Sequence, residues 1–339
     1  MYLVAPDSFK GTFTSAEVAA AMARGLERVG AEAQVCPLAD GGEGTMEVLV
    51  GALGGELVDA AAHDPLGRAI EARFGLLANG SAIVETAEAS GLGHVAEGER
   101  DAEAASSAGT GELIAAAAAA GARRVLVAAG GSATTDGGAG ALEAIARGGG
   151  LRGAELAVLC DVRTAFERAP SVYGPQKGAD PAAVARLEAR LGELARNFKQ
   201  DPRGVPMTGA AGGLAGGLWA QLGAELMPGA EAALDAVGFD RRLAAAERML
   251  TGEGRLDSQS VEGKLVGVIA QRCLATGKPL DVVAGTIELD DAAARLSAHS
   301  VRAAATIAEI ETAAEAIAGE ASSDDQVRKR CPGRPARRG

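Results

Sequence analysis

Residues 125–147 read VLVAAGGSATTDGGAGALEAIAR, and they contain a complete structural unit. The short apolar run 125–129 is rich in valine, which predicts a buried β-strand. Residues 130–138 hold four glycines around one aspartate, which predicts a tight loop. We expect a helix over 137–147. A strand that leads through a loop into a helix is the building block of parallel α/β sheets.

The same order of glycine-rich loop between strand and helix recurs in four other segments. They are APDSFKG at 5–11, ADGGEGT at 39–45, GAAGGLAGG at 209–217 and TGEGRLDS at 251–258. Open α/β sheets bind ligands beyond the carboxyl ends of their strands, and helix N-termini bind anions. A single loop of this kind is equally consistent with a binding site and with an ordinary tight turn. Five of them favour a phosphate-binding site in which the loops come together in space.

Other segments set the fold class. Thr14 and Glu17 have capping-box spacing, so a helix should run to about Val29. Three strand-like pieces between residues 57 and 85 are separated by turn signals, which predicts an antiparallel meander and a second domain. A further short strand should end at Leu250. We therefore predict an α/β protein with a mostly parallel sheet and two α/β domains.

Composition excludes several function classes. The chain has 339 residues, a net charge of −12 and only 3% aromatic residues, which disfavours nucleic acid and anionic membranes as partners. No apolar run reaches membrane-spanning length, and the N-terminus does not resemble a leader. The four cysteines form no CxxC pair, so we expect a reducing cytoplasm rather than a disulfide framework or zinc site. The sequence contains no GxxxxGK[ST] motif, so we do not expect a standard P-loop enzyme. It also contains no strict GxGxxG after a strand, which removes the main support for a nicotinamide-dependent enzyme.

Lysines and acids in the loops suggest the chemistry. Only six of the 33 basic residues are lysines, and four of them, Lys10, Lys177, Lys264 and Lys278, adjoin a glycine. A compact ammonium beside a flexible loop suits phosphate binding at Lys10, and for Lys177 and Lys264 a solvated loop lysine is an equal alternative. Lys278 precedes Pro279 at a helix end and is interpreted as a helix terminator. Phosphoryl transfer needs carboxylates for Mg²⁺, cations for the phosphate and a base for the hydroxyl proton. Histidine is not required.

These segments resemble the type I glycerate kinase family. The resemblance rests on APDSFKG at 5–11, PLADGGEGT at 37–45, GTGELI at 109–114, GGSATTDGGAG at 130–140, CDV at 160–162, GPQKGA at 174–179, GAAGGLAGGL at 209–218 and TGEGRLDSQS at 251–260. The motifs occur in the family's order and span about residues 1–319. The stretch between Arg147 and Leu156 is shorter than is usual for the family, and the segment after CDV also differs.

The resemblance implies phosphorylation of D-glycerate by ATP with Mg²⁺, with the 2-hydroxyl favoured as the acceptor. It also implies a Rossmann-like domain, for which we take residues 1–60 plus 240–319, and a second α/β domain over 61–239, with the active site in the cleft between them. Residues 320–339 carry many basic and few apolar residues, which predicts a disordered basic tail. We expect a monomer or homodimer.

The resemblance also allows roles to be assigned. For catalysis we select Asp257, Lys10, Asp7 and Asp40, with Asp257 as the favoured base and Lys10 on the transferring phosphate. The nucleotide would contact Gly130, Gly131, Ser132, Gly137, Gly212, Gly213 and Lys264. The substrate would contact Ser8, Gly41, Gly42, Arg255 and Ser258, and the metal ligands would come from Asp136, Asp161 and Glu253.

Two other functions stay open from the sequence. One is a kinase for another small hydroxy acid, which would keep the loops and change the substrate pocket. The other is a non-catalytic protein that binds a nucleotide or metabolite. Turnover in the presence of ATP and a panel of hydroxy acids separates the three.

Overall fold

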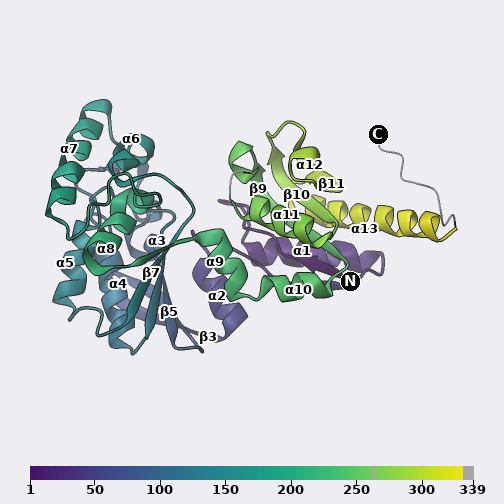
Figure 1. Ribbon diagram of the computed structural model, residues 1–339, viewed down its shortest axis with the longest axis horizontal. Helices are drawn as coiled ribbons and strands as arrows, with labels where there is room; N and C mark the ends of the chain where they lie inside the picture. Colours follow the sequence, from purple (N-terminus) through teal and green to yellow (C-terminus); the bar gives the residue numbers. More distant parts are fainter. Residues whose placement is uncertain (262–263, 331–339) are drawn as a thin grey trace. The chain divides into compact units, whose positions relative to one another are not determined.

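A computed structural model of the chain describes residues 1–261 and 264–330. The chain folds into two compact units (Figure 1). The first unit combines Met1–Leu38 with the chain from Gly238 onward, and the second unit is Ala39–Val237. Both contain a mixed set of strands and helices, so the predicted α/β class is confirmed. Among the described helices, none combines the length and apolar character needed to cross a lipid bilayer.

The first unit is built on a fully parallel five-stranded sheet. Its strands are β1 (Tyr2–Val4), β2 (Ala33–Val35), β9 (Arg248–Leu256), β10 (Leu280–Ile287) and β11 (Ser300–Ala303), in the order β11-β10-β9-β1-β2. Its helices are α1 (Ser15–Arg28), α10 (Phe239–Ala245), α11 (Leu265–Thr276), α12 (Ala292–Arg295) and α13 (Ile307–Arg330). The chain moves outward from β1 to β2 and then returns to β9 on the other side of β1. The pair β1/β9 is therefore the topological switch point, where doubly wound sheets bind their ligands.

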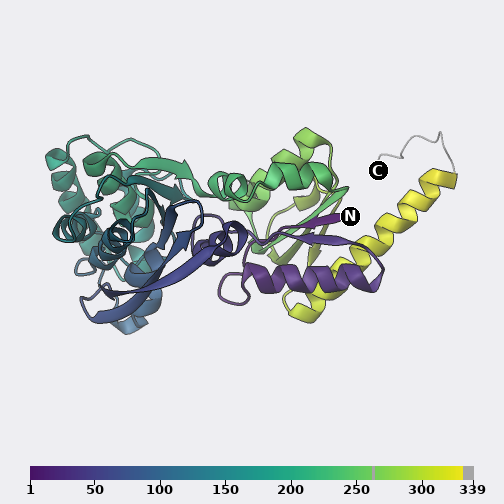
Figure 2. The same ribbon diagram turned by 90° about the horizontal axis from the view of Figure 1, so that it is seen from below.

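Helices α1 and α13 lie side by side and share a core with this sheet (Figure 2). The capping box starts α1 as predicted: the amide of Glu17 donates to Thr14 Oγ1 at 3.2 Å, and the amide of Thr14 donates to Glu17 Oε2 at 2.8 Å. Buried side chains of α1, such as Met22 and Leu26, pack with Ile310 of α13. This apolar layer holds β1 and its carboxyl end in place.

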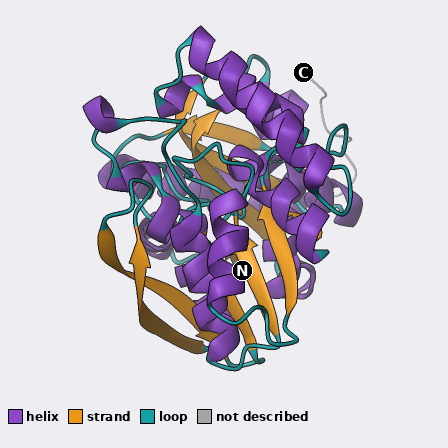
Figure 3. Cartoon of the chain, turned by 90° about the vertical axis from the view of Figure 1, so that its left-hand side faces the viewer, coloured by secondary structure: helices purple, strands orange, loops and turns teal. Residues whose placement is uncertain are grey.

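The second unit contains a six-stranded mixed sheet in the order β3-β4-β5-β6-β7-β8. Its strands are β3 (Gly55–His63), β4 (Ala69–Leu77), β5 (Ser81–Glu85), β6 (Arg124–Ala128), β7 (Glu155–Cys160) and β8 (Glu225–Pro228). Its helices are α2 (Thr45–Leu53), α3 (Thr86–Ser90), α4 (Ala108–Ala119), α5 (Ala139–Arg147), α6 (Ala169–Tyr173), α7 (Pro181–Asn197), α8 (Leu214–Leu222) and α9 (Gly229–Ala236). The predicted meander is confirmed, because β3/β4 and β4/β5 are antiparallel. The remaining pairs are parallel, and Figure 3 shows helices of this unit in front of its strands.

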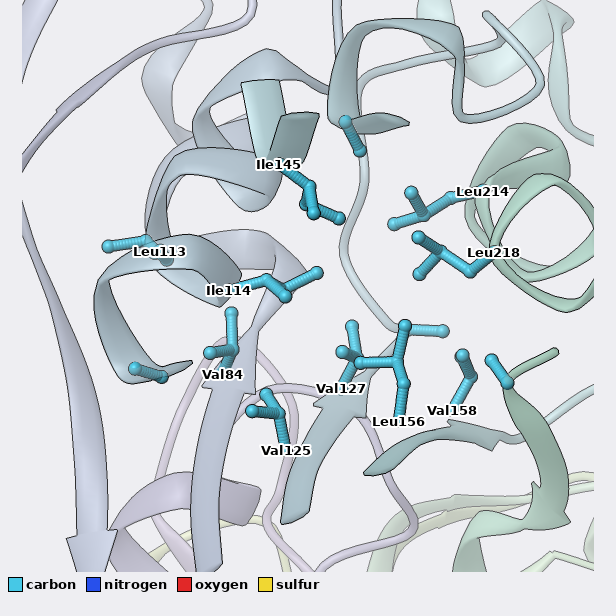
Figure 4. Packing of buried hydrophobic residues seen from close by; sticks show 14 of the residues in the cluster. Val84, Leu113, Ile114, Val125, Val127, Ile145, Leu156, Val158, Leu214 and Leu218 are labelled. Carbon is cyan, nitrogen blue, oxygen red and sulfur yellow. The ribbon is translucent and has the colours of Figure 1, made fainter. Parts of the chain in front are cut away.

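Valines of the parallel strands pack directly against three helices in the second unit (Figure 4). Val125 and Val127 of β6 are buried, and Ile114 of α4 and Leu218 of α8 belong to the same apolar cluster. Each fully buried apolar side chain of this size stabilises the fold by roughly 1.5–3 kcal/mol. The cluster therefore fixes β6 and α5, and with them the glycine loop that joins these two elements.

Three expectations about the chain's organisation were wrong. Residues 39–60 belong to the second unit, because α2 packs against β4 and β5 and β3 pairs with β4 along its whole length. Strand β9 does not end at Leu250 but continues to Leu256, since Gly252 and Gly254 let neighbouring backbone lie close to it. Helix α13 continues to Arg330, into the predicted disordered tail. The rest of that tail lies outside the described residues.

Candidate active site

The first unit gathers polar residues at the switch point between β1 and β9. Just beyond β1, the amide of Asp7 donates to the carbonyl of Gly252 in β9 at 2.8 Å. Asp7 is buried, and its Oδ1 accepts the amide of Ser8 at 2.7 Å. A Cβ on Gly254 would lie 3.0 Å from the Cα of Phe9 and 3.2 Å from the nitrogen of Lys10. Glycine in β9 therefore lets the 5–11 loop lie against the 251–258 segment.

Glu253 is the buried acid of this group. Its Oε1 atom has no hydrogen-bond partner among the described residues. Burial raises the pKa of Glu253 to about 7, while a hydrogen bond with Ser260 and the charges of Lys264 and Lys10 oppose that rise. The charge of Asp257 acts in the same direction as burial. Glu253 therefore shares its surroundings with two lysines and a second carboxylate.

Beyond β9 the chain turns through Ser258–Val261 before α11 begins. The amide of Asp257 donates to Ser260 Oγ at 3.0 Å, which fixes the start of this turn. Arg255 is largely exposed and lies between two acids, with Nε 3.6 Å from Asp257 Oδ2 and a guanidinium nitrogen 2.5 Å from Glu288 Oε2. Lys264 precedes α11 as its N-cap residue. The eight site residues predicted in this unit thus collect around β1, β9 and the start of α11.

In the second unit, three of the predicted glycine loops meet. A Cβ on Gly130 would lie 2.5 Å from the Cα of Gly42, so loop 39–45 and loop 130–138 touch through two glycines. On the other side, the amide of Gly137 donates to the carbonyl of Gly212 at 3.1 Å. A Cβ on Gly212, whose φ is +66°, would lie 1.9 Å from the carbonyl oxygen of Thr134. Glycine is required at these contacts because backbone meets backbone.

Asp136 organises loop 130–138 from within. Its Oδ2 accepts the amide of Ser107 at 2.9 Å, the hydroxyl of Ser107 at 2.8 Å and the amide of Gly140 at 3.2 Å. Its Oδ1 accepts the amide of Gly138 at 3.0 Å. Four donors on one buried carboxylate tie the loop to the starts of α4 and α5. This arrangement is typical of a structural brace.

Asp40 and Asp161 stand at the same edge of the second unit's sheet. Asp40 is buried, and its Oδ1 accepts the amide of Gly42 at 3.1 Å, which shapes loop 39–45. Asp161 follows β7 and is exposed, and its charge acts on the buried thiol of Cys160 and on Tyr173. Glu43 faces the loop as well, because a Cβ on Gly131 would lie 2.2 Å from Glu43 Oε1.

Comparison with known proteins identifies the chain. The sequence profile of the glycerate kinase family matches residues 2–149 and 146–330. The chain belongs to the glycerate kinase family. It is 35% identical to the glycerate 2-kinase of Escherichia coli K12 over 326 residues, covering 85% of this chain and 86% of that protein. It is 36% identical to a glycerate kinase of Halalkalibacterium halodurans, covering 84% and 85% of the two chains.

A solved structure agrees. A crystal structure from Salmonella typhimurium LT2, which carries a provisional assignment as glycerate kinase 2, has a TM-score of 0.81 and 33% identity. It covers 96% of this chain and 99% of that one. The two parts of the glycerate kinase family match meet at residues 146–149, beside the stretch from Arg147 to Leu156 that is short for the family. The resemblance found in the sequence is therefore confirmed.

Two buried charged residues of this glycerate kinase family member were missing from the predicted site. Lys177 is 2% exposed and lies beneath loop 130–138, where Nζ donates to Ser132 Oγ at 2.9 Å and to the carbonyl of Thr134 at 2.6 Å. Glu85 ends β5, and its Oε1 accepts the amide of Met46 at the start of α2 at 2.6 Å. Two sequence signals pointed to Lys177, the glycine beside it and the GPQKGA motif at 174–179. Nothing in the sequence around Glu85 indicates its burial.

The candidate ligand residues fit a divalent cation unevenly. Among the described residues, no group of three or more His, Cys, Asp or Glu could hold a metal alone. Mg²⁺ sites, however, often use one or two carboxylates together with water and substrate phosphates. Glu253, with an unpartnered buried oxygen, and the exposed Asp161 suit that arrangement. Asp136 suits it poorly, because a metal would displace hydrogen bonds that hold its loop.

Proposed function

We propose that this chain is a kinase that transfers the γ-phosphoryl group of ATP to D-glycerate, at the 2-hydroxyl. The observation that carries the proposal is the meeting of loop 39–45, loop 130–138 and the turn at 209–213 in one unit of a glycerate kinase family member. Relatives named glycerate kinase and glycerate 2-kinase support the substrate and the position of transfer.

The nucleotide's phosphates would be held by the second unit. Loop 130–138 leads into α5, and its backbone amides and small side chains offer donors for anionic oxygens. Within the described residues, the buried hydroxyls of Thr134 and Thr135 have no hydrogen-bond partner, which marks the loop as polar and incompletely satisfied. We assign phosphate binding to Gly130, Gly131, Ser132, Gly137, Gly212 and Gly213, with Lys264 as a further cation.

Other residues are assigned to the hydroxyl, to the transferring phosphate and to the substrate. The hydroxyl oxygen of glycerate forms a bond to the γ-phosphorus, the bond from that phosphorus to the β–γ bridging oxygen breaks, and ADP leaves. The hydroxyl proton passes to a carboxylate, for which we favour Asp257, and Lys10 stabilises charge on the transferring phosphoryl group. Asp7 and Asp40 would orient the substrate. Its remaining contacts would come from Ser8, Gly41, Gly42, Arg255 and Ser258.

A divalent cation would complete the reaction's charge balance. We expect Mg²⁺, held by Glu253 or by Asp161 directly or through water, because carboxylate oxygens are the ligands that Mg²⁺ prefers. When bound, it neutralises negative charge that develops on the phosphate oxygens. Asp136 keeps the loop in shape in this proposal rather than binding the metal.

Phosphorus NMR of the product tests activity and position together. The purified chain is incubated with D-glycerate, ATP and Mg²⁺, and the spectrum is compared with authentic 2-phosphoglycerate and 3-phosphoglycerate. We expect ADP and the 2-phosphoglycerate signal in equal amounts. No glycerate-dependent ADP, with turnover of another small hydroxy acid under the same conditions, would contradict the substrate. A 3-phosphoglycerate signal would contradict the position of transfer.

A further inference from the structure

Lys177 is an ammonium group held in a dry position under loop 130–138. It ends the tight turn Pro175–Lys177, and the next residue, Gly178, has a φ of +91°. A Cβ on Gly178 would lie 2.5 Å from the carbonyl oxygen of Arg100, so the turn is pressed against neighbouring backbone. The lysine side chain leaves this turn inward and reaches Ser132 and Thr134.

The burial of Lys177 is costly for folding. An ammonium has three N–H donors, and within the described residues two acceptors meet them, Ser132 Oγ and the carbonyl of Thr134. Burial lowers the pKa of Lys177 to about 7, and the charge of Asp136 opposes this shift only in part. Taking an ammonium out of water costs several kcal/mol, and two hydrogen bonds to uncharged acceptors offset only part of that cost. The positive charge therefore has a use beyond stability.

The neighbours of Lys177 indicate that use. Because Ser132 Oγ accepts from the ammonium, its own hydroxyl hydrogen is available to a further acceptor. The buried hydroxyls of Thr134 and Thr135 have no partner among the described residues. A set of donors with one cation and few acceptors is complementary to an anion, and charge-assisted donors bind phosphate oxygens most strongly.

We propose that Lys177 is a positioning residue for the nucleotide, which holds Ser132 and Thr134 in place and lends its positive charge to phosphate binding by loop 130–138. This inference rests on the proposed function, in which that loop takes the phosphates of ATP. Lys177 acts through the loop and does not touch the substrate. It should therefore affect the affinity for phosphorylated nucleotides and leave the affinity for glycerate unchanged.

Lys177→Met tests the proposal, with Lys278→Met as the matched control. Lys278 also donates to two backbone carbonyls, those of Ala244 and Ala246, and it lies just before β10, at the amino end of the sheet and opposite the end that carries the candidate site. Dissociation constants for ATP, ADP and adenosine are measured by calorimetry on the full chain, together with the KM values for ATP and glycerate and the thermal midpoint. The control should bind all three ligands as the wild type does.

For Lys177→Met we expect ATP and ADP to bind about tenfold or more weakly, as for the loss of a charge-assisted contact. The affinity for adenosine and the KM for glycerate should stay within about twofold of the wild type, with the thermal midpoint equal or higher. ATP affinity within twofold of the wild type would overturn the proposal. So would an equal loss for adenosine or a lowered thermal midpoint, because either result indicates a structural role. If the wild type itself binds no ATP, the proposed function fails and this inference fails with it.

Discussion

Replacing Gly130 with alanine tests whether contact between two glycine loops is needed for activity. The added Cβ would lie 2.5 Å from the Cα of Gly42 and 3.4 Å from the nitrogen of Glu43. Nonbonded carbon atoms prefer separations of about 3.5–4.0 Å, so the two loops must move apart by about 1 Å. The obstacle is backbone, which cannot rotate out of the way as the end of a flexible side chain can.

The expected effect on stability is modest and the effect on activity is large. Inserting a methyl group into a packed contact costs about 1–3 kcal/mol, so the free energy of unfolding of Gly130→Ala should fall by that amount. A displacement of about 1 Å at groups that position substrates can cost about 10²-fold in rate. We therefore expect kcat/KM for glycerate at saturating ATP to fall by about that factor.

The assay couples ADP release to a spectroscopic signal, and urea unfolding gives the stability of each variant. Gly51→Ala is the control, because Gly51 is an exposed position of α2 with no atom within 4 Å of an added Cβ. Alanine there should raise stability by about 0.5–1 kcal/mol and leave turnover unchanged. If Gly130→Ala keeps kcat/KM within about threefold of the wild type, close contact between the two loops is not needed for activity.

Four further substitutions separate chemistry from structure. Lys10→Ala and Asp257→Asn should each lower kcat by orders of magnitude with little change in thermal midpoint, and near-normal turnover would exclude the assigned role. Asp136→Asn cannot accept all four hydrogen bonds, so unfolding should become easier by about 2–4 kcal/mol, whereas an activity loss at full stability would indicate a metal ligand instead. Burial raises the pKa of Glu85 from 4.5 to about 7. The carboxyl group therefore stays protonated to a higher pH in the folded chain than in the unfolded chain, and stability is lost as the pH rises through that range. As the pH rises from 5 to 8, the free energy of unfolding of Glu85→Gln, measured in urea, should therefore increase relative to that of the wild type by up to about 3 kcal/mol. A difference between the two proteins that does not change with pH would contradict the raised pKa of Glu85.

Local signals in the sequence predicted the elements that depend on local physics. The capping box of Thr14 and Glu17 needs only residues three apart, and both of its hydrogen bonds are present. The valine-rich run of β6 is followed by its glycine loop and by α5, as its apolar character and glycine content predict. The turn signals before β4 and β5 also gave the antiparallel meander.

Features that depend on tertiary contact could not be predicted in the same way. Residues 251–256 contain two glycines and were expected to form a loop, yet they form the end of β9, because these glycines admit the backbone of Phe9 and Val283. The observed border between the units differs from the predicted one, because β3 pairs with β4 and this pairing does not depend on the sequence before β3. The burial of Lys177 and Glu85 depends on elements distant in the chain. Charged residues are exposed by default, so sequence alone gave no reason to place either inside.

A crystal structure of the full chain with a non-hydrolysable ATP analogue would show directly which loops hold the phosphates. We expect phosphate oxygens to lie within hydrogen-bonding distance of backbone amides in loop 130–138, with Gly212 or Gly213 beside them. Phosphates bound to a part of the chain that contains none of the glycine loops would contradict it.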